Sequence, residues 1–176
     1  RVKQNILQQS YIGAIFTQGD PALPSSARTL GADMRLATSR FLGQDRNFSF
    51  NAFVLKSSNE GVTGDDAAYG VNAEYPNDKL NMTFSLRDIQ RNFQPALGFV
   101  SRTNVRFLQT LFEYDPRPKG FLNVRQMFNE FFFTRYTRLT TGQVESWRIQ
   151  AAPVNWLFNS GDLIEFNYAP QFERLF

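Results

Sequence analysis

Apolar and polar residues alternate one by one along much of this chain. The clearest segment is residues 79–88, in which Leu80, Met82, Phe84 and Leu86 alternate with Asn81, Thr83, Ser85 and Arg87. The same alternation occurs at residues 30–39, 47–54, 69–75 and 164–171. A β-strand places successive side chains on opposite faces, and these segments lack the three-to-four-residue spacing of an amphipathic helix. The pattern therefore predicts strands with one apolar and one polar face.

Four further segments are predicted as strands with more mixed faces, namely residues 7–17, 101–114, 122–138 and 143–157, which brings the expected number to nine. Pro153 is expected to weaken its strand, because proline has no N–H for the strand ladder. Long links are expected at 19–26, 57–66 and 91–100, and short ones at 43–45, 76–78 and 159–162. The link at 115–120 is intermediate, and 140–143 is short where a long one is expected. Long links at one end and short links at the other are typical of outer-membrane barrels.

The alternation alone fits two environments for the apolar face, a protein interior or lipid, and three features favour lipid. Charged residues lie within the predicted strands at Asp33, Arg35, Glu74 and Arg87. Aromatic residues lie near predicted strand ends, as in the girdles of membrane barrels: Tyr11, Phe41, Tyr69, Tyr75, Tyr114, Tyr136 and Trp156. The predicted strands are also longer than the roughly five or six residues usual in soluble domains.

The predicted fold class is all-β: an antiparallel meander of about nine long strands that forms part or all of a transmembrane β-barrel. Residues 1–176 are expected to be a single barrel domain or a barrel fragment. The chain begins in mid-pattern, and bacterial single-chain barrels have even strand numbers. An odd count therefore predicts either a barrel that is incomplete relative to the full-length protein or a strand count that is wrong by one.

Composition excludes several kinds of chemistry. The 176 residues include no Cys and no His, so disulfides, serine triads, Cys-His pairs and His-zinc sites are excluded within this chain. The net charge of +3 comes from scattered residues and does not indicate nucleic-acid binding. A glycosidase-like carboxylate pair needs only two suitably spaced carboxyls, but no spacing selects a pair. We therefore expect no enzymatic activity and no cofactor.

Several segments resemble a known bacterial family. The most specific is Asn92-Phe93-Gln94-Pro95-Ala96-Leu97-Gly98-Phe99-Val100-Ser101-Arg102, supported by residues 10–17, 29–35 and 64–66. These segments resemble the C-terminal β-barrel domain of unknown function in outer-membrane proteins that carry an N-terminal family-9-like carbohydrate-binding module. The resemblance covers about residues 10–115, and it implies an outer-membrane location and a barrel architecture without an assigned reaction.

Two groups of residues are candidates for a functional role. Polar residues expected to face a barrel lumen are Asp33, Arg35, Asn51, Asn72, Glu74, Asn81 and Arg87. They could set ion selectivity or neutralise one another. The residues of the family-like loop motif are Asn92, Phe93, Pro95, Gly98, Phe99 and Arg102, which could narrow a lumen or anchor the loop. The acidic loop 57–66 is interpreted as solvated, because it lacks the spaced carboxylates of a calcium loop, and no metal site is expected.

The leading functional hypothesis is an outer-membrane β-barrel segment of a Gram-negative bacterium with a passive transport, channel or anchoring role. Its expected partners are outer-membrane lipid and, in addition, other protein subunits or an attached sugar-binding module, but not nucleic acid. One alternative is a soluble calycin-like barrel that binds a small hydrophobic ligand. A further alternative is a structural subunit of a larger membrane complex.

Overall fold

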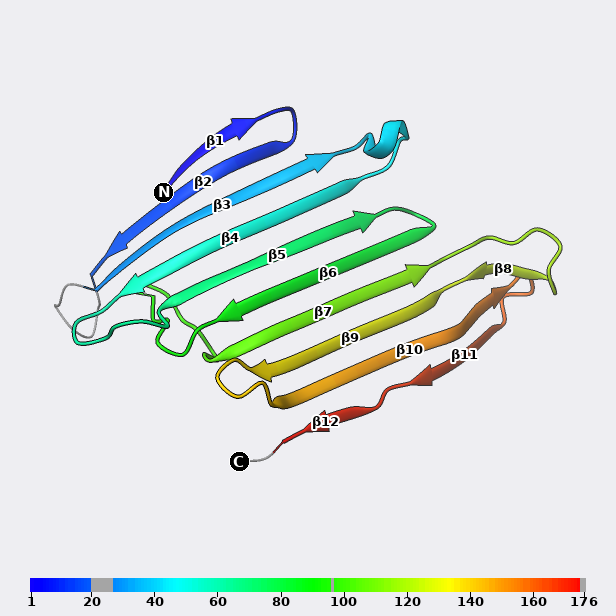
Figure 1. The fold of residues 1–176 in the computed structure, drawn as a ribbon. Coiled ribbons are helices and arrows are strands. Elements are labelled where there is room, and N and C mark those ends of the chain that lie inside the picture. The colour runs from blue at the N-terminus through cyan, green and yellow to red at the C-terminus, as the bar shows by residue number, and fades with distance from the viewer. Residues whose placement is uncertain (20–26, 96, 175–176) are drawn as a thin grey trace.

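The structure, a computed structural model, describes residues 1–19, 27–95 and 97–174 and is all-β (Figure 1). One antiparallel sheet contains twelve strands. They are β1 (Val2–Ile6), β2 (Ser10–Gln18), β3 (Arg28–Thr38), β4 (Phe48–Ser58), β5 (Ala67–Pro76), β6 (Leu80–Ile89), β7 (Val105–Tyr114), β8 (Val124–Met127), β9 (Asn129–Arg138), β10 (Val144–Phe158), β11 (Leu163–Tyr168) and β12 (Gln171–Glu173). A short 3-10 turn, η1 (Phe41–Gly43), lies between β3 and β4.

The strands follow one another across the sheet in chain order, which confirms the predicted antiparallel meander. The order is β1-β2-β3-β4-β5-β6-β7-β9-β10-β11, and β8 and β12 both pair with β10. Trp156 of β10 pairs with Met127 of β8 and with Ile164 of β11. Thus β8 and β9 follow one side of β10, while β11 and β12 follow the other.

The number of strands exceeds the nine expected, for local reasons. Strand β1 pairs with β2 through a turn that begins at Leu7, whose φ is 55°. A left-handed leucine is uncommon, and this turn has no Gly, Asn or Pro to indicate it. The predicted strand 122–138 is split at Phe128 into β8 and β9, and the last strand is split before β12, next to Pro170.

Proline at position 153, which was expected to weaken its strand, does not end it but lies where the strand pairing is irregular. Strand β10 runs continuously past Pro153. Its pairing with β11 shifts register between Ala151 and Val154. An extra residue in one strand leaves one position out of the ladder, so the missing proline N–H costs no strand hydrogen bond.

The connections at the two ends of the sheet differ: one end, termed the long-link end, carries the longest connection, and the other, termed the short-link end, carries the three shortest. The long-link end, on the left of Figure 1, carries connections 59–66, 90–104 and 139–143 and the one between β2 and β3, of which residues 20–26 lie outside the described residues. The short-link end carries 7–9, 77–79 and 159–162. Two connections at this end are longer than expected, 39–47, which includes η1, and the one between β7 and β8.

The sheet has two chemically different faces, which cross-strand partners define. Ile12, Met34, Ala52, Val71, Leu86 and Leu108 form one row across β2 to β7. The neighbouring row is Tyr11, Arg35, Asn51, Asn72, Ser85 and Gln109. Because side chains alternate between faces along each strand, the first row belongs to what we term the apolar face and the second to the polar face.

Exposure differs between the two faces. Large exposed hydrophobic side chains in β2 to β9 all lie on the apolar face: Ile12, Phe16, Leu30, Leu36, Val54, Tyr69, Met82, Phe84, Phe112, Tyr114 and Phe131. Several of the most buried strand residues, Thr29, Ser49, Ser57, Val105 and Phe107, lie on the polar face. The crowded side of the sheet is therefore the polar one.

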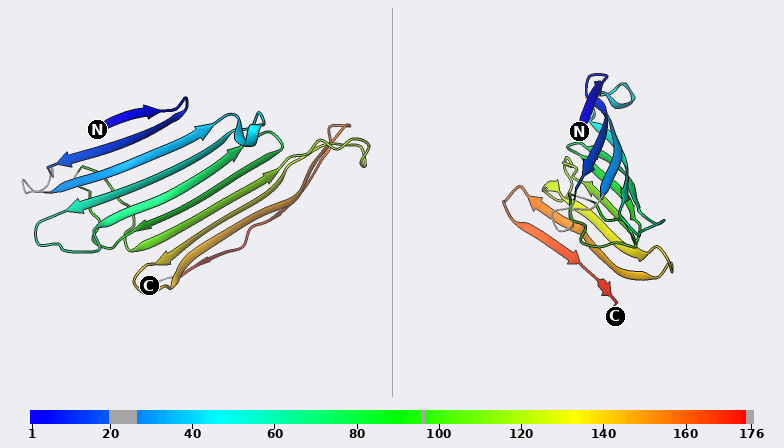
Figure 2. Two further views of the ribbon diagram at one scale, coloured as in Figure 1. Left: turned by 45° about the horizontal axis from the view of Figure 1, so that its top comes forward. Right: turned by 90° about the vertical axis from the view of Figure 1, so that its left-hand side faces the viewer.

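The sheet is bent and open (Figure 2). Within residues 1–19, 27–95 and 97–174, β1 pairs only with β2, and β11 and β12 pair only with β10. The outer strands lie on opposite sides of the sheet in Figure 1. The expectation that further strands complete a barrel stays a prediction.

Aromatic rings gather on the apolar side at the short-link end. The ring of Phe41 stacks on that of Phe48 with centroids 4.5 Å apart and meets the edge of Tyr75 at 6.1 Å. The rings of Phe121 and Trp156 meet edge to face at 5.9 Å. Of the seven aromatic residues expected near strand ends, Tyr11 and Tyr136 instead lie on the polar face, since their positions in the alternation are polar-face positions.

Candidate functional site

The register places all seven polar candidates on the polar face. Arg35 pairs with Asn51, Asn51 with Asn72, and Asp33 lies two residues before Arg35 on β3. The others follow by their strand partners: Glu74 opposite Ser49, Arg87 opposite Gly70 and Asn81 opposite Glu113. The alternation of β3 to β6 is unbroken, so residues far apart in sequence share one surface.

Side-chain contacts link the polar face in short steps from strand to strand. The Arg1 guanidinium lies 3.0 Å from the Asp33 carboxylate. The Asn51 amide Nδ2 donates to Asn72 Oδ1 at 3.1 Å. Ser49 Oγ donates to the Glu74 carboxylate at 3.0 Å. Each charged group thus contacts a near neighbour.

Arg87 makes a different kind of contact, with aromatic rings. Its guanidinium lies 4.7 Å from the ring centroid of Phe107, which lies 4.6 Å from the ring of Tyr136. Arg102 covers Tyr136 at 4.8 Å. Cations over ring faces are attracted by the ring quadrupole. Phe107 was absent from the sequence-based candidates, because an apolar residue at a polar-face position carries no signal of function.

The loop 90–104 folds onto the end of the polar face and carries the family-like motif. Asn92 Nδ2 donates to the carbonyl of Gly64 at 2.8 Å, and the amide of Gln94 donates to Ser57 Oγ at 3.0 Å. Ser57 is fully buried, and Phe93 is 4% exposed. In contrast, Phe99 of the same loop is 90% exposed. The two phenylalanines of the motif therefore have different environments, one buried and one in solvent.

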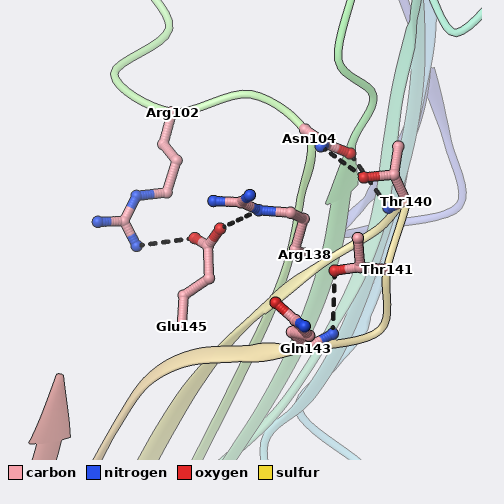
Figure 3. A network of polar contacts seen from close by, with 7 residues as sticks. All are labelled: Arg102, Asn104, Arg138, Thr140, Thr141, Gln143 and Glu145. Atoms are coloured by element: carbon pink, nitrogen blue, oxygen red, sulfur yellow. Dashed lines mark hydrogen bonds and ion pairs between the residues drawn. The ribbon is translucent and has the colours of Figure 1, made fainter. Parts of the chain in front are cut away.

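The far end of this loop is tied to the turn between β9 and β10 (Figure 3). Glu145 accepts a hydrogen bond from Arg138 Nε at 2.7 Å and lies 3.7 Å from Arg102. Asn104, with φ of 58°, donates to Thr140 Oγ1 at 2.9 Å and accepts from the Thr140 amide. The loop is therefore fastened at both ends, to Ser57 of β4 and to β9–β10.

Pro95 and Gly98 lie in contact with each other within this loop. A Cβ added to Gly98 would meet the Pro95 ring carbon Cγ at 3.2 Å. This distance is tighter than ordinary van der Waals contact. Glycine at position 98 therefore leaves room for the Pro95 ring.

The carboxylates of the loop 57–66 have nearby cations. Asp65 lies 3.1 Å from Arg91, and Asp66 lies 3.5 Å from Lys56. In the described part of the chain, no three acidic side chains are arranged to hold a metal ion. The described residues also contain no helix long and apolar enough to cross a membrane.

The short-link end of the polar face is acidic. Glu113 lies directly opposite Glu130 in the ladder of β7 and β9, and Asp115 follows β7. Burial, followed by the charges of Glu113 and Asp78, raises the pKa of Asp115 above its ordinary value. Nearby, Asp78 and Arg117 form a two-pronged pair at 2.6 and 3.0 Å, and that hydrogen bonding lowers the pKa of Asp78.

Replacing Asp115 with asparagine is expected to stabilise the protein at neutral pH by less than about 1 kcal/mol. A raised carboxyl pKa means that the folded state disfavours the charged form, so its contribution to stability is largest at low pH and declines as the pH rises through that pKa. The gain should therefore vanish near pH 3. Urea unfolding at both pH values measures it.

Asp78→Asn is the control of opposite sign. The lowered pKa of Asp78 contributes stability above its ordinary pKa, which is lost as the pH falls. This variant should destabilise at pH 7. Equal effects of the two variants at pH 7 would contradict the assignment of opposite environments.

No protein-family model, no curated protein and no solved structure matches this chain. The two unlike faces and the anchored loop 90–104 are therefore the features from which a function can be inferred.

Proposed function

We propose that this sheet forms part of the wall of a β-barrel in the outer membrane of a Gram-negative bacterium, with a passive channel, transport or anchoring role. In this arrangement the apolar face contacts lipid and the polar face lines the interior. The observation that carries the proposal is the segregation of exposed large hydrophobic side chains in β2 to β9 onto one face. Contiguous exposed apolar surface of this kind indicates a membrane or protein contact.

Strand dimensions support this arrangement. Strands β3 and β4 contain 11 residues each, and β5, β6, β7 and β9 contain 10 each. Tilted strands of about 9–11 residues span a bilayer. Paired antiparallel strands also satisfy their backbone groups where no water is available.

Both ends of the apolar face carry residues suited to a membrane boundary. Rings of Phe41, Phe48 and Tyr75 meet at the short-link end. At the long-link end, the buried carboxylate of Asp88 accepts two hydrogen bonds from Arg106, at 2.8 and 2.7 Å. Aromatic girdles at the edges of an apolar band are typical of membrane barrels, and the ion pair with Arg106 compensates the buried Asp88 carboxylate.

Crowding on the polar side argues against a soluble calycin-like barrel. Such a barrel encloses its apolar face, so Met82 and Phe84 would be buried and Asn81 and Thr83 would face water. Instead, Met82 and Phe84 are 36% and 42% exposed, and the neighbouring polar residues are less exposed. The sequence resemblance to an outer-membrane barrel domain favours the same proposal.

The proposal assigns no reaction to this chain. The sequence contains no His or Cys. Among the described residues, nothing distinguishes one carboxylate at the short-link end of the polar face as a general acid and another as a general base. In this proposal the polar face acts through its charges and through the loop 90–104, which packs on one end of it. A structural subunit of a larger membrane complex would use the same two faces.

The full-length protein is expected to remain in the membrane pellet after carbonate extraction and to need detergent for a monodisperse preparation. Exposed apolar surface drives both results, because removing it from water is favourable by roughly 25 cal/mol per Å². Cell fractionation and size-exclusion chromatography measure them. A monodisperse, detergent-free protein that binds a hydrophobic dye inside a cavity would instead establish the calycin-like alternative.

A further inference from the structure

The outer edge formed by β11 and β12 is the most exposed part of the sheet. Every residue of both strands is exposed. In the described ranges, both strands pair with β10 on one side only. An edge of this kind presents unpaired backbone N–H and C=O groups and is a template for strand addition.

This edge continues the two-faced pattern of the sheet. Ile164, Phe166 and Tyr168 alternate with Glu165 and Asn167. Phe166 pairs with Val154 and Ile164 with Trp156, so the large side chains extend the apolar face. Unpaired backbone groups are unfavourable in hydrocarbon, so in the proposed barrel the wall continues beyond this edge.

Two carboxylates lie on the polar side of this edge. Glu165 accepts a hydrogen bond from Asn167, and Glu173 lies opposite Ser146 of β10. Neither carboxylate forms an ion pair with any of the described residues. Opposite charges on paired strands are favourable and like charges are unfavourable.

We infer that the β11–β12 edge takes an added antiparallel strand of amphipathic pattern, with apolar residues on one side and Lys or Arg on the other. This inference depends on the proposed barrel wall and states the chemistry of the strand that continues it. Strand β1 of this chain has that pattern, but Lys3 within it and Arg1 just before it already have partners. Arg1 contacts Asp33, and Lys3 lies 3.6 Å over the ring of Tyr11.

Two synthetic peptides test the inference on the detergent-solubilised full chain. In one, Lys alternates with Val over ten positions, and in the other Glu replaces every Lys. We expect the Lys peptide to bind about tenfold more tightly, because opposite-charge pairs across strands are favourable and like-charge pairs are unfavourable. Fluorescence anisotropy of labelled peptide in a non-ionic detergent measures the two affinities.

Matched charge variants locate the binding. The double variant Glu165→Gln with Glu173→Gln should reduce the preference to within about twofold. The control, Asp45→Asn with Glu60→Gln, changes the net charge equally at exposed positions away from the edge and should keep the preference. Equal binding of both peptides, or a preference that survives the edge variant, would overturn the inference.

A second copy of this chain is the competing occupant. Because the chain has no Cys, a Lys3→Cys chain mixed with a Glu165→Cys chain reports contact between the edges of two copies. A disulfide-linked dimer would show that a second copy occupies the edge and would overturn the inference. Peptide binding without a disulfide-linked dimer would support the inference. Carbonate extraction tests the barrel wall separately, so either proposal can fail alone.

Discussion

Replacing Phe84 with arginine is expected to destabilise the protein in phospholipid vesicles by about 2–4 kcal/mol, the cost of a cation at the bilayer midplane on a barrel strand. Phe84 lies in the middle of β6, between Ala73 and Thr110 on the apolar face. Its side chain is 42% exposed. In the proposed barrel the substitution replaces an apolar ring that contacts lipid with a charged guanidinium. Urea unfolding of vesicle-inserted protein measures the change.

Ser85→Arg is the matched control for Phe84→Arg, because it introduces the same group one residue away on the polar face. Ser85 lies between Asn72 and Gln109, and the substitution should cost less than about 1 kcal/mol. Single cysteines, Phe84→Cys and Ser85→Cys, can carry a polarity-sensitive dye. The dye at position 84 should report the more apolar environment, and equal emission at both positions in vesicles would contradict the assignment of the faces.

Replacing Phe93 with alanine is expected to release the loop 90–104 from the polar face at a cost of about 3–5 kcal/mol, the range for truncating a buried phenylalanine. Phe93 is 4% exposed, and the adjacent Gln94 amide donates to buried Ser57. Loss of the ring removes the apolar contact that holds the loop beside that hydrogen bond. Denaturant unfolding measures the cost, and the rate of tryptic cleavage after Arg102 measures the release.

Phe99→Ala is the control within the same loop. The ring of Phe99 is 90% exposed, so its loss should change stability by less than about 0.5 kcal/mol and leave the cleavage rate unchanged. In a reconstituted barrel that conducts, Phe93→Ala should also increase single-channel conductance, since the loop is anchored at one end of the polar face. Identical behaviour of the two variants would show that the loop is not anchored through Phe93.

Strand partners explain why some candidate residues were predictable and others were not. Asp33, Arg35, Asn51, Asn72, Glu74, Asn81 and Arg87 share a face because a period of two is a local property of the extended backbone. Their partners are not local. Arg87 of β6 contacts Phe107 on the neighbouring strand β7, and only the register between these two strands brings the side chains together.

The loop shows the same division. Its motif was recognisable as a sequence, and Gly98 and Pro95 marked it as structured. Nothing in the spacing distinguished buried Phe93 from exposed Phe99, because burial depends on which ring meets the sheet. Arg102 reaches Glu145 and Tyr136 only after β9 and β10 have taken their places.

By itself, the sequence determined that the chain forms an antiparallel meander with two unlike faces, since alternation of side chains follows directly from strand geometry. Only the tertiary structure decided that β1 adds a strand, that Pro153 fits at a register shift, and that the polar side is the crowded one. Those features depend on register, on the bend of the sheet and on loop docking. All three arise from contacts between residues far apart in the chain, which no local pattern records.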